Sequence, residues 1–454
     1  MFVVINPIRV LAIRLWMAVA ALAGIGILAY DIVRIRFDRS VAFADGLRTY
    51  LFVAANQRRL FDVLRFFQPI LVTKTVLVKT YASIGTVMLT RYDDCEEVIR
   101  RESDFENVYE PIMRDICGGN NFFLGMQDTP EYTRDVANMR KAVRREDLQG
   151  RLVPFVADLA ESIVAESRGR LDVAKDLTLA IQAKISADYF GVPGRSPEEL
   201  CEWTTVLFWY AFYNLDMHDH LTRRAHEAAE LLAAHIDLII ATRKASGDAR
   251  DDVIGRCLKL QAAGVDGMDD AHIRTDVMGL LIALIPTISK ATVQALAQLI
   301  DRPDARAAAR LAALEGDTKG VAAHIFEAMR FDPFSPVIFR RAVTDSVIAA
   351  GTWRQRRVPK GYMVLAVNLA AMFDPVAVAS PGRFVAGRPW QLYMLWGFGR
   401  RMCFGTYINT AVIPAVVAPL LRQKDLRRAE GSAGQIDGDG SPFPAHFVVE
   451  FTPA

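Results

Sequence analysis

Cys403 stands in a segment whose composition suits a metal-bound thiolate. Residues 396–405 read WGFGRRMCFG, an aromatic, glycine-rich loop that leads into an apolar helix. Glycine permits a tight turn, and the backbone N–H groups of that turn, the positive end of the following helix and the neighbouring Arg401 would keep the sulfur deprotonated. Thiolate ligation of haem iron favours O–O cleavage. The loop therefore predicts Cys403 as an axial iron ligand in oxidative haem chemistry, and the alternative is a buried structural cysteine.

The pattern aromatic-x-x-Gly-x-Arg-x-Cys-x-Gly has its fixed positions at Trp396, Gly399, Arg401, Cys403 and Gly405. It resembles the signature of the cytochrome P450 family. That resemblance implies a mainly α fold with small β-sheets, in which haem b, iron protoporphyrin IX, lies between a long central helix and the helix that follows the cysteine loop. It also implies a monooxygenase-type oxidoreductase that acts on a hydrophobic, lipid-like small molecule. A separate reductase or ferredoxin would supply electrons, because the chain contains no flavin or nicotinamide fingerprint.

A charged set upstream of the loop follows the order found in the same family. Glu327 and Arg330 are three residues apart and share one face of a helix. Arg383 follows in the sequence Pro-Gly-Arg-Phe. By resemblance, these three residues form a buried Glu-Arg-Arg network behind the cysteine loop. The spacing alone is weak support, because most Glu-x-x-Arg pairs are solvated helix pairs.

The two propionates of haem need cationic or hydrogen-bonding partners in an apolar pocket. Arg401 is the first candidate because it lies two residues before the cysteine. The segment around Arg341 resembles a propionate-binding strand, with Arg340 as its alternative. Residues 128–134, DTPEYTR, resemble a helix start that serves the same purpose, which adds Tyr132 and Arg140 as candidates. For these last two, an ordinary basic helix face is the alternative.

Residues 276–300 form the longest apolar helix of the chain, and a helix that is apolar nearly all round must be buried. Pro286 removes one helical hydrogen bond and predicts a kink. Relatives that split O₂ have an acid before the threonine at this place, whereas this chain has Pro286 before Thr287. Thr287 favours monooxygenation, and Pro286 favours a peroxygenase or isomerase that uses a peroxide or lipid hydroperoxide without a reductase. A non-catalytic haem- or lipid-binding protein is the second alternative.

Composition bounds the organisation of the chain. Its 454 residues contain no linker or low-complexity tract, which predicts one catalytic domain at residues 41–454 after an N-terminal anchor and flank at residues 1–40. The net charge of +2 indicates no nucleic-acid partner. Near the N-terminus, residues 15–30 form an uninterrupted apolar stretch with arginines on both sides. This stretch predicts a membrane anchor. A cleaved signal peptide and a helix buried against the catalytic domain are the alternatives.

Five cysteines without short pair spacing predict neither a disulfide framework nor a zinc site. Such a set suits a reducing compartment, with the catalytic domain on the cytoplasmic side of the membrane. The remaining patterns predict a strand pair at residues 76–90 with a hairpin turn at 83–85, followed by a helix from residue 92. Apolar residues at helical spacing predict further helices at residues 152–164, 177–189, 203–215 and 225–240.

Overall fold

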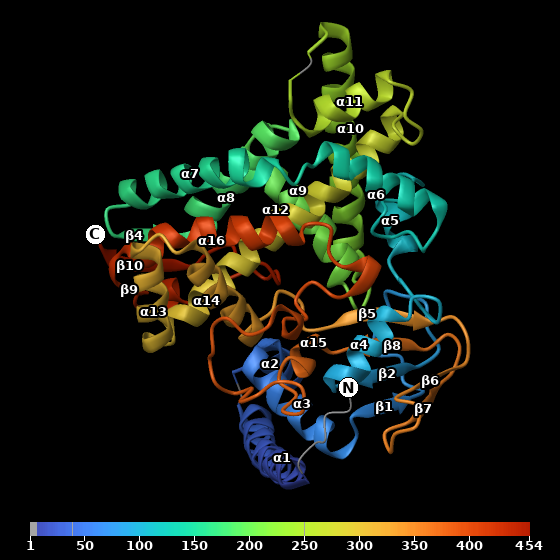
Figure 1. Ribbon diagram of the computed structural model, residues 1–454, viewed down its shortest axis with the longest axis vertical. Helices are drawn as coiled ribbons and strands as arrows, with labels where there is room; N and C mark the ends of the chain where they lie inside the picture. Colours follow the sequence, from blue (N-terminus) through green and yellow to red (C-terminus); the bar gives the residue numbers. More distant parts are fainter. Residues whose placement is uncertain (1–6, 39, 249) are drawn as a thin grey trace. The chain divides into compact units, whose positions relative to one another are not determined.

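The fold is mainly α with small β-sheets, as the sequence predicts. The computed structural model describes residues 7–38, 40–248 and 250–454, which Figure 1 traces from blue to red. These residues form two compact units. Unit 1 takes the described parts of Met1–Leu77, Ala82–Glu106 and Phe326–Cys403, and unit 2 takes those of Val78–Tyr81, Asn107–Ile325 and Phe404–Ala454. The division into a 1–40 anchor and a 41–454 catalytic domain stays a prediction.

Unit 1 is built on a five-stranded sheet. Its strand order is β1-β2-β8-β5-β3, with bounds Ile70–Thr73, Thr86–Leu89, Met363–Ala366, Ile338–Ala342 and Phe105–Glu106. Only β2 and β8 run parallel within this sheet, with Thr86 opposite Met363. Helix α4 (Tyr92–Arg100) buries Cys95, Val98 and Ile99 in the same core as the sheet. That burial follows the i, i+3, i+4 spacing of one helix face.

The predicted strand pair at residues 76–90 is wrong in its first half. The antiparallel partner of β2 is β1, which ends at Thr73, so residues 74–85 connect the two strands. Thr86, the first residue of β2, donates from Oγ1 to the carbonyl of Thr75 in this connection at 2.7 Å. The alternating apolar pattern of residues 76–85 therefore belongs to a loop. A side-chain hydrogen bond connects this loop to β2, but the two do not pair as strands.

The helices α1 (Pro7–Phe37), α2 (Phe43–Phe52) and α3 (Ala54–Phe67) also belong to unit 1. Helix α1 contacts α3, where a Cβ on Gly24 would lie 3.2 Å from Val63. Met17 and Ala21 are buried, but other apolar side chains of α1, such as Leu15 and Val19, are exposed. Residues Leu11–Phe37 are long and apolar enough to cross a membrane by length and composition.

Unit 1 is completed by short elements. These are the hairpin of β6 (Ser346–Ile348) and β7 (Arg356–Val358), α15 (Asn368–Ala371), η4 (Trp390–Leu392) and η5 (Gly399–Arg401). Helix α14 (Thr318–Phe331) contributes its last residues, from Phe326, to this unit.

Unit 2 is mostly helical. Its helices are α5 (Glu110–Ile116), α6 (Pro130–Ala142), η1 (Leu148–Leu152), α7 (Val153–Glu166), η2 (Val173–Thr178), α8 (Leu179–Lys184), η3 (Ile185–Phe190), α9 (Pro197–Phe212), α10 (Asp219–Ser246), α11 (Val253–Ala262), α12 (Asp270–Ile300), α13 (Pro303–Leu314), α16 (Thr406–Arg422) and η6 (Gly431–Gly434). An antiparallel sheet has the order β4-β10-β9, with bounds Arg170–Asp172, Val448–Thr452 and Lys424–Arg428. Helix α12 is buried along most of its length, which confirms the prediction of a buried central helix. It begins six residues before the predicted residue 276, because Asp269 caps its N-terminus by accepting from the backbone N–H of His272.

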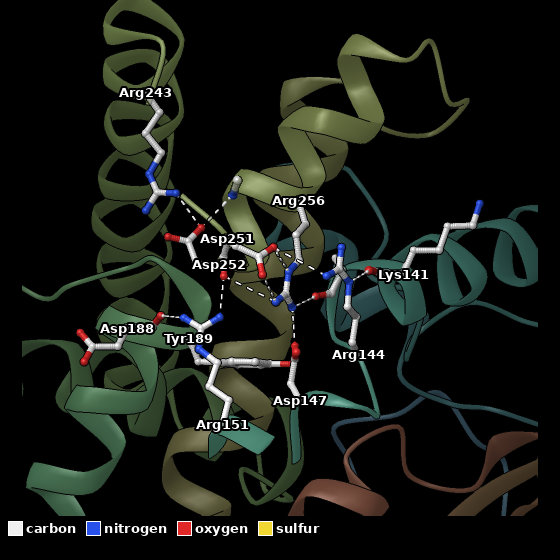
Figure 2. Close-up of polar contacts among 12 residues, drawn as sticks. Lys141, Arg144, Asp147, Arg151, Asp188, Tyr189, Arg243, Asp251, Asp252 and Arg256 are labelled. Atoms are coloured by element: carbon white, nitrogen blue, oxygen red, sulfur yellow. Dashed lines mark hydrogen bonds and ion pairs between the residues drawn. The ribbon is translucent and has the colours of Figure 1, made fainter. Parts of the chain in front are cut away.

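Buried arginines connect several helices of unit 2, as Figure 2 shows. Arg256 on α11 is almost fully buried and donates to Asp147 at 2.5 Å and to Asp251 at 2.8 Å. Arg243 at the end of α10 donates to Asp252 at 2.6 Å. Buried guanidinium groups need such carboxylates, and the pairs fix the α10–α11 connection against the segment before η1.

Candidate functional site

The cysteine loop of unit 1 is a tight, hydrogen-bonded turn. The backbone N–H of Cys403 donates to the carbonyl of Trp396 at 3.0 Å, which closes the loop. Gly397 and Gly399 both have φ of +71°, in the left-handed region that favours glycine. The sulfur-bearing residue itself is half-buried. The predicted glycine at 399 is therefore required by backbone conformation.

Aromatic rings support the first half of this loop. The indole of Trp396 stacks on that of Trp390 with centroids 4.9 Å apart and an interplanar angle of 13°. The ring of Phe326 meets Trp396 edge-on at 5.5 Å. Nearby, the side-chain amide of Asn368 donates to the carbonyl of Met394 at 3.2 Å. The aromatic residue of the predicted motif, Trp396, thus packs the loop rather than pointing away from the unit.

The other four cysteines are held as thiols. Desolvation by burial raises the pKa of Cys117 and of Cys257 to about 12. Burial also raises the pKa of Cys95, and raises the pKa of Cys201, whose thiol lies beside Thr205. Because a thiolate is the metal-binding form of cysteine, these four sites disfavour metal ligation. Cys403 differs from them in standing half-exposed in a glycine turn.

Glu327 and Arg330 form the predicted pair in unit 1, and both side chains are completely buried. Arg330 Nε donates to Glu327 Oε2 at 2.9 Å, and its Nη2 donates to Oε1 at 2.7 Å. This is the bidentate geometry of a strong charge-assisted contact. The backbone N–H of Val385 donates to the same carboxylate at 2.9 Å, and Tyr393 donates to it from its hydroxyl.

The third member of the network is Arg388, so the prediction of Arg383 is wrong for the side chain. Arg388 Nε donates to Glu327 Oε1 at 3.2 Å. The carbonyl of Arg383 accepts from Arg330 at 3.2 Å and from Arg388 at 3.0 Å, while its own side chain is exposed. The sequence offered two arginines five residues apart, and the path of an irregular segment selected the second.

The two arginines predicted to bind propionates in unit 1 have carboxylate partners there. Arg401 Nε lies 3.3 Å from Glu102 Oε2, and the guanidinium is mostly buried. Arg341 Nε donates to Glu106 Oε1 at 2.6 Å and lies on β5. Glu102 and Glu106 carried no sequence signal, because neither lies near the cysteine loop in the chain. Arg340, the alternative to Arg341, is buried and donates to the carbonyl of Phe339.

Helix α6 of unit 2 holds the segment directly after the cysteine. Thr129 caps the helix by accepting from the backbone N–H of Tyr132, whose side chain is buried. Arg140 donates to the carbonyl of Phe404 at 3.0 Å, and its guanidinium lies 3.7 Å from the centroid of that ring. Gly405 is the N-cap residue of α16. Arg140 is thus more than part of a solvated basic face.

Helix α12 runs through Pro286 as one continuous helix. Between Thr275 and Val293, only Ala283 and Thr287 are half-exposed, and they stand four residues apart on one face. Thr287 Oγ1 donates to the carbonyl of Ala283 at 2.5 Å. The helix therefore has an open position at the predicted threonine. Pro286 lies inside this unbroken helix, and the kink stays a prediction.

Two neighbouring phenylalanines of unit 2 were not predicted. A Cβ on Gly279 of α12 would lie 2.4 Å from the ring of Phe122, so this glycine allows the ring to rest on the helix. The ring of Phe123 lies 5.2 Å from that of Phe404. The Phe-Phe pair was the only sequence signal, and it is too common to identify a site.

The sequence and fold match known proteins over most of the chain. The family model described as cytochrome P450 matches residues 75–432. A solved structure of P450BioI in complex with an acyl carrier protein ligated to hexadec-9Z-enoic acid is similar, with a TM-score of 0.73 and 17% identity. The alignment covers 88% of this chain and 99% of that chain. This similarity confirms the predicted fold.

Curated relatives match over shorter segments. Cytochrome P450 76M5 of Oryza sativa subsp. japonica is 31% identical over 245 residues, which cover 48% of this chain and 48% of the relative. Cyclomarin C epoxidase CymV of Salinispora arenicola (strain CNS-205) is 24% identical over 260 residues, which cover 56% and 62%. Each match therefore spans less than two thirds of the relative.

Proposed function

Because the chain belongs to the cytochrome P450 family, we propose that it is a monooxygenase of hydrophobic small molecules with Cys403 as its iron ligand. The cofactor of this oxidoreductase family is haem with an axial cysteine thiolate. When bound, it supplies the redox chemistry, and thiolate ligation favours O–O cleavage. The observation that carries the proposal is that Cys403 alone stands half-exposed in a glycine turn, whereas burial holds the other four cysteines as thiols.

The cysteine loop fits a thiolate ligand for physical reasons. Left-handed glycines at 397 and 399 turn the backbone around the sulfur, and the N–H of Cys403 is fixed on Trp396. The stacked indoles on one side limit motion of the loop. Such rigidity holds the sulfur where it can meet a metal without reorganisation.

The charged residues would bind the propionates. The candidates are Arg401 and Arg341, each of which is oriented by a glutamate, together with Tyr132 and Arg140. An arginine that is already held by one carboxylate keeps further N–H donors in a fixed fork for a second acid.

Thr287 would manage the proton on the substrate side. Its Oγ1 holds a proton at a half-exposed position of an otherwise buried helix, and the carbonyl of Ala283 accepts that proton in a hydrogen bond. Pro286 removes any acid from the neighbouring position. Only the hydroxyl remains there to pass a proton.

The substrate would be apolar and lipid-like. Ala283 and Leu284 lie on the same face of α12 as Thr287, four and three residues before it, and offer no charge. The similar structure of P450BioI holds a fatty acyl group on an acyl carrier protein. A reductase or ferredoxin would be the electron donor.

Pro286 supports a second candidate function, the conversion of a peroxide or lipid hydroperoxide without a reductase. A non-catalytic haem- or lipid-binding protein is the remaining alternative. The test compares purified full-length protein with NADPH and a reductase against the same protein with a fatty acid hydroperoxide. Substrate oxidation that consumes NADPH supports the monooxygenase. Turnover of hydroperoxide alone supports the second candidate, and turnover in neither assay contradicts both.

Helix α1 would anchor the protein to a membrane, with the remaining chain on the cytoplasmic side. Its exposed apolar side chains support this. A Leu15→Asp/Val19→Asp double variant should sediment less with phospholipid vesicles than the wild type. The matched control is Leu311→Asp/Leu314→Asp, which charges two exposed leucines of α13. Equal loss in both double variants would contradict the assignment to α1.

A further inference from the structure

A cavity of about 330 Å³ lies entirely within unit 2. It is bounded by α5, the segment after α5, the start of α6 and the first turns of α12. Its volume is at the lower end of the range for small-molecule pockets. The cavity can therefore hold a small ligand or one end of a larger one. The residues that line it are Glu110, Arg114, Gly119, Asn120, Asn121, Met126, Gln127, Thr129, Glu131, Arg134, His272, Thr275 and Asp276.

The unusual group in the wall is the carboxyl of Asp276. Its residue is 2% exposed, and its Oδ2 has no hydrogen-bond partner among the described residues. The adjacent Thr275 Oγ1 also has none in the described chain. A buried polar oxygen without a partner is unfavourable, and a buried unpaired charge is much more so. Both oxygens would be satisfied by a ligand that donates hydrogen bonds.

The surroundings of Asp276 disfavour its ionised form. Desolvation raises the pKa of Asp276 well above its usual range, and the negative charge of Asp135 acts in the same direction. Arg134 opposes both effects, but it does so only in part because it is engaged elsewhere. Its Nε donates to Asp135 at 2.8 Å and its Nη1 to Asp266 at 3.0 Å.

The other cation in the wall is engaged in the same way. Arg114 donates to Glu110 at 3.0 Å, so its charge is balanced within the wall. His272 lies 2.7 Å from Asp269 through Nδ1. Glu131 is a second carboxylate, which is hydrogen-bonded to a backbone N–H and to Thr129 and which Arg134 affects only through its charge. The wall therefore carries an excess of acidic over free basic groups.

We propose that this cavity binds a small organic cation with N–H donors, a guanidinium or primary ammonium group, through the carboxylate of Asp276 and the hydroxyl of Thr275. A cation at this place stabilises the ionised form of Asp276, which burial otherwise disfavours, supplies the missing partner of Oδ2 and offsets the acidic excess of the wall. The amide oxygen of Asn121, another lining residue, has no hydrogen-bond partner among the described residues and offers a further acceptor. This site goes beyond the proposed oxidation and does not depend on it.

The probe is n-butylguanidinium, with n-butylurea as its neutral isostere. A guanidinium stays protonated and has no free lone pair to ligate iron, unlike a free amine. Isothermal titration of the full-length holoprotein should show binding of n-butylguanidinium. Its affinity for Asp276→Asn should be lower on the order of tenfold or more, because Asn keeps the shape and removes the charge. The control is Asp158→Asn, an exposed carboxylate on α7, which should bind like the wild type.

Three results would overturn the proposal. They are no binding by the wild type at millimolar probe, unchanged affinity in Asp276→Asn, and equal affinity of the wild type for n-butylurea. The comparison of the two ligands on the wild type needs no variant, so it decides the question even if Asp276→Asn fails to fold. Because the titration measures binding alone, its outcome is independent of whether the protein oxidises any substrate.

Discussion

Arg388 Nε lies 3.2 Å from Glu327 Oε1, and both side chains are buried in unit 1. Together with the bidentate Arg330, this contact gives Glu327 two cationic partners. Arg383 supports the same cluster through its carbonyl, which any residue at that position would supply. The side chains of Arg388 and Arg383 should therefore contribute very different amounts to the free energy of unfolding.

Substitution of Arg388 by alanine should lower the free energy of unfolding by about 3 kcal/mol, the low end for breaking a buried ion pair, because Arg330 stays bound to Glu327. The matched variant Arg383→Ala should change it by less than about 0.5 kcal/mol, as for an exposed side chain. Urea unfolding of both variants measures the difference. Equal losses of unfolding free energy in the two variants would contradict the assignment of Arg388, rather than Arg383, as the side-chain partner of Glu327.

Cys403→Ser should abolish the strongly red-shifted Soret band of the reduced, CO-bound protein, because a hydroxyl does not replace a thiolate on iron. Cys201→Ser is the control, since that cysteine is also half-exposed but lies in α9 with a raised pKa. The absorption spectrum of each reduced variant under CO provides the measurement. An unchanged band in Cys403→Ser would remove the basis for the proposed function.

Thr287→Val should separate the two candidate reactions. Valine keeps the shape of threonine but cannot hold a proton or donate to Ala283. Reductase-driven turnover should fall at least on the order of tenfold, in line with the loss of a general acid–base group. Turnover of a fatty acid hydroperoxide should change little, because it needs no proton from this hydroxyl. Equal loss in both assays would indicate a structural role for Thr287.

His446 should make stability depend on pH. Its Nδ1 lies 2.7 Å from Asp172, and this hydrogen bond raises the pKa of His446 above its ordinary 6.5. A raised folded-state pKa contributes stability that is complete below the unfolded pKa and is lost as pH rises through the folded pKa. The wild type should therefore exceed His446→Gln in stability most clearly at pH about 5 to 6. Urea unfolding from pH about 5 to 9 measures this difference. A constant difference across that range would contradict the assignment.

The sequence determined the features that depend on short spacing. A glycine turn before a helix fixed the environment of Cys403, and the Glu-x-x-Arg spacing fixed the contact of Glu327 with Arg330. The burial of α12 followed from apolar residues on every face. In each case, the geometry of one turn or one helix places the groups, and neighbours in the chain are neighbours in space.

Tertiary structure decided the features that depend on distant segments. The choice of Arg388 over Arg383, the pairing of Arg401 with Glu102 and the burial of an unpaired Asp276 all required the path of irregular loops or the packing of separate helices. A long side chain can reach any of several partners, and burial of a carboxyl depends on elements that are far apart in sequence. Composition and periodicity record which residues can make such contacts, but only the folded chain brings one partner within reach and removes water from around it.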